Sequence, residues 1–217
     1  MTALRDGLPP VPLRMQGRPV DARGYPVPWF VAYVNGVPDF RIVDGRKVPL
    51  AINESLCWLC GQKLGVYKTF VLGPMCAINR TISEPPSHKA CAEFAVKACP
   101  FLILPRAKRR EANKPEGTTE PAGFALQRNP GAALLWTTKK FKTYRAHAGA
   151  EGILIRVGDP ESLSWWCEGR AANRAEVARS IECGLPNLEE LAKQDGEEAI
   201  RDLVVAVRRM QPLLPAA

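Results

Sequence analysis

Residues 54–65 read ESLCWLCGQKLG, and this stretch decides how the first half of the chain folds. Cys57 and Cys60 have the two-residue spacing that lets a tight turn wrap around a metal ion. Gly61 follows at once, where such a turn tends to need a residue that tolerates unusual backbone angles. The stretch therefore predicts a turn that supplies two thiolate ligands to zinc.

A second pair of potential ligands is separated from Cys60 by 27 residues. His88 and Cys91 are three residues apart at the start of an expected helix, so their side chains project from neighbouring positions on one face. The positive end of that helix also favours the thiolate of Cys91. We expect Cys57, Cys60, His88 and Cys91 to bind one structural Zn²⁺; the alternative is that they are buried side chains of an ordinary core.

The remaining cysteines have less distinctive surroundings. Cys76 and Cys99 lie near the expected ligands in sequence, and we interpret them as small buried side chains. The alternative is that one of them replaces His88 as a ligand. Cys167 and Cys183 are expected to be core or surface residues.

The order of these motifs resembles the treble-clef zinc finger over residues 56–101. In that fold a Cys-x-x-Cys-Gly turn is followed by a hairpin and then by a helix that carries the other two ligands. The stretches CWLCG, GPMCAINRTISEPPSHKACAEFAVKACPFL and GDPESLSWWCEGRAANRAEV also resemble a family of bacterial and bacteriophage hypothetical proteins with no assigned activity. That resemblance implies a bacterial or phage source and assigns no functional residues.

Two kinds of zinc enzyme are alternatives for this motif. Cys91-Ala92-Glu93 resembles the deaminase tripeptide, in which a metal ligand precedes an acid/base glutamate. In deaminases, however, the Cys-x-x-Cys pair comes after the tripeptide, and here His88 would close the position that a catalytic water needs. The His-metal-finger nucleases need a histidine in the hairpin, and residues 66–81 contain none. A hydrolase is therefore the alternative function rather than the leading one.

The whole chain is ordinary in composition but uneven in charge. It has 217 residues, a net charge of +8 and seven cysteines. No leader peptide or run of 18 apolar residues is visible, so we expect a cytoplasmic protein without a membrane partner. In a reducing compartment the cysteines indicate metal binding or burial rather than disulfides. Residues 105–145 hold 10 basic and 3 acidic side chains, a net charge of +7.

This basic middle predicts contact with DNA or RNA, because cations can track phosphates and aromatic rings can stack on bases. The expected binding residues are Arg106, Lys108, Arg109, Arg110, Lys139, Lys140, Phe141, Lys142, Tyr144 and Arg145. If residues 136–145 form one strand, Trp136 shares a face with Lys140, Lys142 and Tyr144. The alternatives are a solvated linker and an edge strand that lysines protect from pairing.

We expect an α+β protein, with a treble-clef-like zinc-binding domain followed by a small α+β domain that ends in helices. The expected boundaries are 1–26 for an extended arm, 27–104 for the zinc domain, 105–130 for a basic linker and 131–217 for the second domain. Strands are predicted near 29–34 and 38–43 around Asn35-Gly36, then in 66–73 and 74–81, and later in 132–146 and 151–158. Helices are predicted before Cys57, from Ser87 to Pro100, and over 161–168, 174–183 and 188–210, the last with a break at 195–196.

The expected function is that of a zinc-stabilised binding or regulatory protein whose partner is nucleic acid or a protein that processes it. A phage or host protein that acts only through protein contacts is a further alternative, which the acidic C-terminal part would suit.

Overall fold

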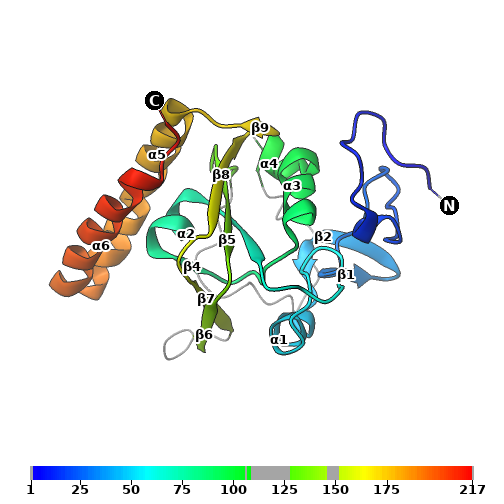
Figure 1. Cartoon of the computed structure of the whole chain (residues 1–217), viewed down its shortest axis with the longest axis horizontal. Helices are drawn as coiled ribbons and strands as arrows, with labels where there is room; N and C mark the ends of the chain where they lie inside the picture. The colour runs from blue at the N-terminus through cyan, green and yellow to red at the C-terminus, as the bar shows by residue number, and fades with distance from the viewer. Residues whose placement is uncertain (1, 106, 109–127, 146–151, 217) are drawn as a thin grey trace.

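The computed structural model describes residues 2–105, 107–108, 128–145 and 152–216 of the chain (Figure 1). It contains both helices and strands, and the described strands form sheets of two, four and three strands. The predicted α+β class is confirmed.

The N-terminal part follows the sequence prediction closely. Strands β1 (Val31–Val34) and β2 (Val37–Val43) form an antiparallel hairpin. Its turn residues Asn35 and Gly36 have φ of 50° and 79°, the positive angles that a tight two-residue hairpin turn requires. Helix α1 (Lys47–Asn53) then leads into the cysteine pair, as expected. The arm before the hairpin contains one short helical turn, η1 (Leu13–Met15).

The central sheet joins the two halves of the chain. Its strands are β3 (Lys68–Leu72), β5 (Ala133–Thr138), β8 (Ser162–Cys167) and β9 (Arg170–Ala171), in that order and all antiparallel. Strand β3 lies in the predicted zinc domain and β5 in the predicted second domain, so their ladder crosses the division expected at 105–130.

Helices cover both faces of this sheet (Figure 1). On one face, Leu134 and Trp136 of β5 pack in the main core with α2 (Pro74–Asn79) and with the hairpin of α5 (Arg174–Asp195) and α6 (Glu197–Met210). On the other face, Leu135 packs against Val96 of α3 (Lys89–Ala98). This double cover explains why all six residues of β5 are buried.

A third sheet lies beside the central one, at the lower edge of the view in Figure 1. Its order is β4 (Thr81–Ile82), β7 (Ile153–Val157) and β6 (Phe141–Arg145), so β6 is an edge strand. The short helices α4 (Pro100–Ile103) and η2 (Gln211–Leu213) complete the described elements.

Three sequence predictions are wrong. Residues 74–81, expected as a strand, form α2 followed by β4, because Pro74 begins a helix well and Met75 and Ile78 become buried on one side of it. Residues 161–168, expected as a helix, contain strand β8, whose residues 162–166 pair with β5. Helix α5 does not end at Gly184 but continues to Asp195. The expected break at 195–196 is confirmed, since Gly196 separates α5 from α6.

Helix α5 begins with a reciprocal cap. The backbone N–H of Glu176 donates to Asn173 Oδ1 at 3.0 Å, and the N–H of Asn173 donates to Glu176 Oε2 at 2.9 Å. Arg170 also binds the Glu176 carboxylate at 2.6 Å. Hydrogen bonds from Arg170 and then from the Asn173 N–H lower the pKa of Glu176 from 4.5 to about 2.

This depressed pKa predicts an acid-sensitive contribution to stability. A carboxylate with a lowered folded-state pKa stabilises the protein above its unfolded pKa, and that contribution is lost as pH falls from 4.5 towards 2. Glu176→Gln keeps a side chain that can complete the cap but removes the charge. We expect the variant to melt below wild type at pH 7 and the gap to narrow below pH 4.5, as measured by thermal unfolding. Glu182→Gln, at an exposed position of the same helix, serves as control; a gap independent of pH would contradict the prediction.

Candidate metal centre

The structure brings the four predicted ligands to one point. One ligand atom from each of Cys57, Cys60, His88 and Cys91 lies within 4.8 Å of every other. The His88 Nδ1 atom is 3.4 Å from Cys60 Sγ and 4.0 Å from Cys91 Sγ. A tetrahedral ion with metal–sulfur bonds of about 2.3 Å and metal–nitrogen bonds of about 2.0–2.1 Å places its ligands roughly 3.5–3.8 Å apart. The cluster can therefore hold a metal ion with little movement of its side chains.

The turn that carries Cys57 and Cys60 is closed by backbone hydrogen bonds. The N–H of Gly61 donates to the Cys57 carbonyl at 2.8 Å, and the N–H of Cys57 donates to the Gln62 carbonyl at 2.8 Å. Gly61 has a φ of +78°, and a Cβ there would lie 2.5 Å from the indole ring of Trp29. The expected need for glycine thus has two causes, the left-handed backbone and the close approach of Trp29.

Hydrogen bonds concentrate negative charge on the sulfur of Cys57. Bonds from the Cys60 and Cys91 thiols, with further bonds from the backbone N–H groups of Cys60 and His88, hold the pKa of Cys57 far below its usual value. Both N–H groups lie 3.4 Å from Cys57 Sγ. The same thiol contacts raise the pKa of Cys60 and Cys91, because a neighbouring thiolate disfavours further ionisation. A bound cation removes this conflict, since it stabilises all three thiolates together.

His88 is oriented by its second ring nitrogen. Its Nε2 lies 3.0 Å from the carbonyl oxygen of Lys63, which can only accept a hydrogen bond. The proton therefore belongs on Nε2, and Nδ1 presents its lone pair to the cysteines, which is the usual arrangement behind a metal-bound imidazole. His88 is also the N-cap residue of α3, one residue after Ser87, where the helix was predicted to begin. Ser87 instead pairs with Thr69 of β3 through two backbone hydrogen bonds.

The segment between the two ligand pairs differs from the predicted hairpin. It contains β3, α2 and β4, and the two strands belong to different sheets. The turn with Cys57 and Cys60 precedes this segment, and the helix with Cys91 follows it, as expected. The treble-clef likeness is therefore limited to the ligand turn and the ligand helix.

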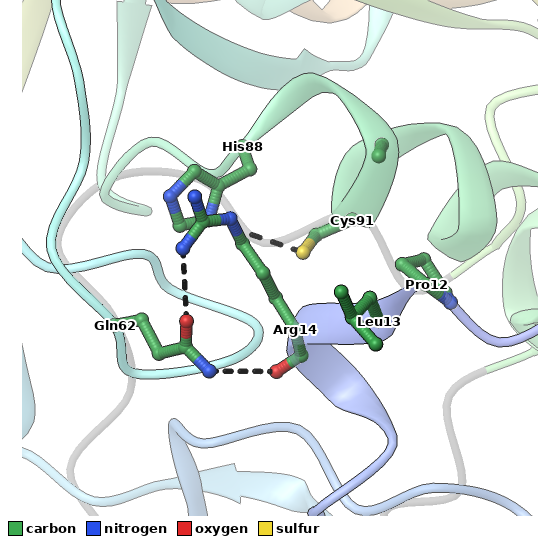
Figure 2. A pocket seen from close by; sticks show the side chains of 7 residues that line it. Pro12, Leu13, Arg14, Gln62, His88 and Cys91 are labelled. Carbon is green, nitrogen blue, oxygen red and sulfur yellow. Dashed lines mark hydrogen bonds between the residues drawn. The ribbon is translucent and has the colours of Figure 1, made fainter.

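The N-terminal arm packs against the cluster. Met15 is buried in a small apolar core with the three cysteines, Leu59 and Phe94. Beside His88 and Cys91 lies a surface pocket of about 410 Å³ that Pro12, Leu13, Arg14 and Gln62 help to line (Figure 2). Arg14 donates to the Gln62 side chain at 2.9 Å, and Gln62 donates back to the Arg14 carbonyl at 3.3 Å. These two bonds fasten the arm to the turn that carries the ligands.

Cys76 and Cys99, the two cysteines that were not expected to bind the metal, lie outside the cluster. Cys76 is on α2 rather than on a strand, and burial raises the pKa of its thiol to about 11. Cys99 follows the last residue of α3. The deaminase candidate Glu93 lies 4.0 Å from Lys89 in an i,i+4 ion pair on α3 and does not belong to the cluster.

The structure separates the predicted nucleic-acid residues into groups. Arg106, Arg109 and Arg110 lie outside the described residues, and Lys108 forms an isolated bridge with Arg128. Lys139 and Lys140 lie between β5 and β6, whereas Lys142, Tyr144 and Arg145 are exposed on β6.

The aromatic residues of this stretch do not share one face. Trp136 is fully buried on β5, so the expectation that it lies beside Lys140 and Tyr144 is wrong. Phe141 packs edge-on against Phe70, with ring centroids 5.7 Å apart. Tyr144 alone among these rings is exposed, at 39%, and its hydroxyl lies 3.0 Å from Thr81 Oγ1.

Sequence reasoning missed Arg156. This residue is exposed on β7, directly opposite Lys142 of β6 and Thr81 of β4. A charged residue within the apolar run ILIRV signals a strand with one open face, and that signal was available in the sequence.

Comparisons of the chain with protein-family models, curated proteins and solved structures find no match. None of the described helices has the length and apolar character needed to span a membrane.

The geometry predicts one bound divalent metal ion per chain. Cys57→Ser and Cys91→Ser should each abolish stoichiometric binding, because the site loses one of its four donors. Cys76→Ala should keep the ion and lose only packing, about 1–3 kcal/mol of stability. Elemental analysis and thermal unfolding of the purified proteins measure both effects. Full metal content in Cys57→Ser, or loss of metal in Cys76→Ala, would contradict the assignment.

Proposed function

We propose that the protein is a zinc-stabilised binding protein that takes nucleic acid on the exposed face of the β4–β7–β6 sheet. The observation that carries the binding surface is a pair of like charges, Lys142 and Arg156, placed directly opposite each other on neighbouring strands. The zinc ion has a structural role and does not contact the nucleic acid.

Zinc is the metal that the donor set favours. Three thiolates and one imidazole in a tetrahedron are typical of structural zinc sites, and harder ions such as Mg²⁺ and Ca²⁺ prefer oxygen ligands. Four protein donors also complete the coordination, which leaves no position for a catalytic water. This closure, with Glu93 turned to Lys89, favours a structural role over a deaminase.

The basic pair has an energetic cost in the protein alone. Like charges directly opposite on an antiparallel pair destabilise the sheet. Among the residues that the structure describes, no carboxylate lies within ion-pair distance of Lys142 or Arg156. Lys139, by contrast, is paired with Glu161 at 3.1 Å. A phosphate bound between Lys142 and Arg156 would relieve the repulsion.

The neighbours of this pair suit a nucleic-acid strand. Tyr144 lies two residues from Lys142 on β6, so both project from the same face of the strand. Lys140 and Arg145 are exposed at the two ends of this stretch. A ring beside several cations is what a single-stranded segment needs, because bases stack while phosphates pair with charge. We call Lys140, Lys142, Tyr144 and Arg156 the basic face; Arg145, one residue after Tyr144, projects to the other side of β6.

The alternative of a protected edge strand explains only part of this surface. Lysines on an edge strand prevent pairing with another chain, and β6 is such a strand. Arg156, however, lies on the central strand β7, where no edge needs protection. Its position opposite Lys142 favours an anionic ligand over edge protection.

A closed zinc site predicts a particular metal chemistry. The purified protein should contain about one zinc per chain, and removal of the ion by a strong chelator should lower the unfolding temperature, since structural zinc contributes roughly 10–16 kcal/mol in finger peptides. Protein reconstituted with Co²⁺ should show the absorption of a tetrahedral thiolate site, unchanged by added azide. If azide shifts the Co²⁺ spectrum, the metal has an open coordination position, and the alternative of a zinc-dependent hydrolase would be favoured.

The basic face predicts salt-dependent binding to nucleic acid. Affinity for a single-stranded oligonucleotide should fall with a log–log salt slope of about −0.7 per phosphate neutralised, and Lys142→Ala or Arg156→Ala should each flatten that slope by about one contact. Tyr144→Ala should weaken single-strand binding more than Tyr144→Phe, which keeps the ring. Arg179→Ala, which removes an exposed charge from α5, is the matched control for net charge.

Titrations by fluorescence anisotropy over a range of salt concentrations measure these effects on DNA and RNA. Absence of binding at about 50 mM salt, where electrostatic contacts are strong, would overturn the nucleic-acid proposal and leave a protein partner for this face. Equal losses in Arg179→Ala and Lys142→Ala would show that only the net charge matters.

A further inference from the structure

The α5–α6 hairpin carries an apolar groove that the rest of the described chain does not fill. The hairpin lies along one side of the molecule, and its far end points away from the sheets (Figure 1). Leu185 and Ala192 of α5 and Ile200, Val204 and Val207 of α6 line a groove of about 410 Å³ between the two helices. Ile200 and Val204 are 41% and 46% exposed, so neighbouring apolar side chains of one helix face solvent together.

The groove has the geometry of a helix-docking site. Its α5 lining recurs at positions 185, 189 and 192, and its α6 lining at 200, 204 and 207, so each helix presents a stripe at helical spacing. The α6 stripe is apolar, whereas the α5 stripe places Leu185 and Ala192 on either side of Glu189, with Lys193 at the rim. Two antiparallel helices with such stripes on the same side are half of a four-helix bundle. The missing half must supply a similar apolar surface.

The charges on α6 identify the occupant. Glu197, Ile200, Val204 and Arg208 follow one another at intervals of three and four residues, so they lie on one face of the helix. This face is acidic at its start, apolar in its middle and basic at its end. A second copy of α6 that runs antiparallel places its Arg208 beside Glu197 and its Ile200 beside Val204, and the two-fold axis repeats both contacts.

We propose that the protein forms a two-fold symmetric dimer in which the α5–α6 groove of one chain packs against the same groove of a second copy. The inference does not depend on the metal or on the basic face. Glu197 makes an ion pair with Arg201 at 3.6 Å within its own helix, and such an exposed pair contributes little and can exchange for Arg208 of the second copy.

The dimer can be tested with the full-length, metal-loaded protein. Sedimentation or light scattering over a concentration series should give a mass of about 48 kDa, twice the 23.9 kDa of one chain. Val204→Glu should weaken dimerisation by about 100-fold or more, because it buries a charge in the centre of the groove. Val205→Glu is the matched control, since Val205 is on the same helix and 42% exposed but does not line the groove.

A charge-exchange experiment separates a second copy from any other helical partner. Arg208→Glu should place two acids together at each end of the interface, and Glu197→Lys should place two bases together, so each variant alone should dimerise at least about tenfold more weakly. An equimolar mixture of the two should recover tight pairing as a heterodimer, because every contact is again between opposite charges. A tag on one variant detects that heterodimer.

Three outcomes would overturn the proposal. One is a mass of a single chain at about 100 µM, a concentration that populates even a weak, micromolar dimer. Another is a dimer that Val205→Glu disrupts as strongly as Val204→Glu, which would place the interface elsewhere. The third is a mixture of the two charge variants that pairs no better than either alone. Circular dichroism of each variant verifies that α6 is folded.

Discussion

The convergence of three sulfur atoms and one imidazole on a single point is the constraint on which the N-terminal half depends. Cys57 and Cys60 come from a turn, and His88 and Cys91 come from the start of α3, so the ligand set ties two distant segments together. The β1–β2 hairpin belongs to no larger sheet among the described residues. Phe30, the residue before β1, packs with Met15 in the apolar cluster around the cysteines.

The ligand cluster is also connected to the central sheet through backbone hydrogen bonds. His88 follows Ser87, which forms a two-bond bridge to Thr69 of β3, and Thr69 pairs in turn with Thr137 of β5. His88 is thus next to Ser87, and Ser87 is hydrogen-bonded to the β3–β5 ladder that links both halves of the chain. A metal ion that fixes His88 would therefore also stabilise the edge of this sheet, which explains why one small site can matter to a chain of 217 residues.

The features that the sequence predicted well are local ones. The ligand spacing, the Asn35-Gly36 turn and the helix start at residue 174, which Asn173 caps, each depend on a few neighbouring residues whose chemistry permits little else. The features that it predicted wrongly depend on distant partners. Residues 162–167 become a strand because β5 provides a hydrogen-bonding neighbour, and their own pattern does not contain that information.

Gly184 is another position whose role depends on a distant part of the chain. Glycine is a common helix terminator, so the sequence predicted a stop there. In the structure Gly184 lies inside α5, and a Cβ at this position would come within 2.9 Å of Met75. The glycine serves the close packing of α2 on α5 rather than the end of a helix. Such a role becomes visible only once the two helices are placed together.

The basic face and the apolar groove each carry a cost in free energy for a chain that is alone in water. Lys142 opposite Arg156 repels, and Ile200 and Val204 expose apolar area to water. Lys142, Arg156, Ile200 and Val204 belong to neither the buried core nor the metal centre, so folding does not explain their exposed positions. They lie on different elements, the β4–β7–β6 sheet and the α5–α6 hairpin, and can therefore be occupied at the same time. A dimer through the hairpin would present two basic faces to one polyanion, and the second contact would then be intramolecular, which raises affinity without any new interaction.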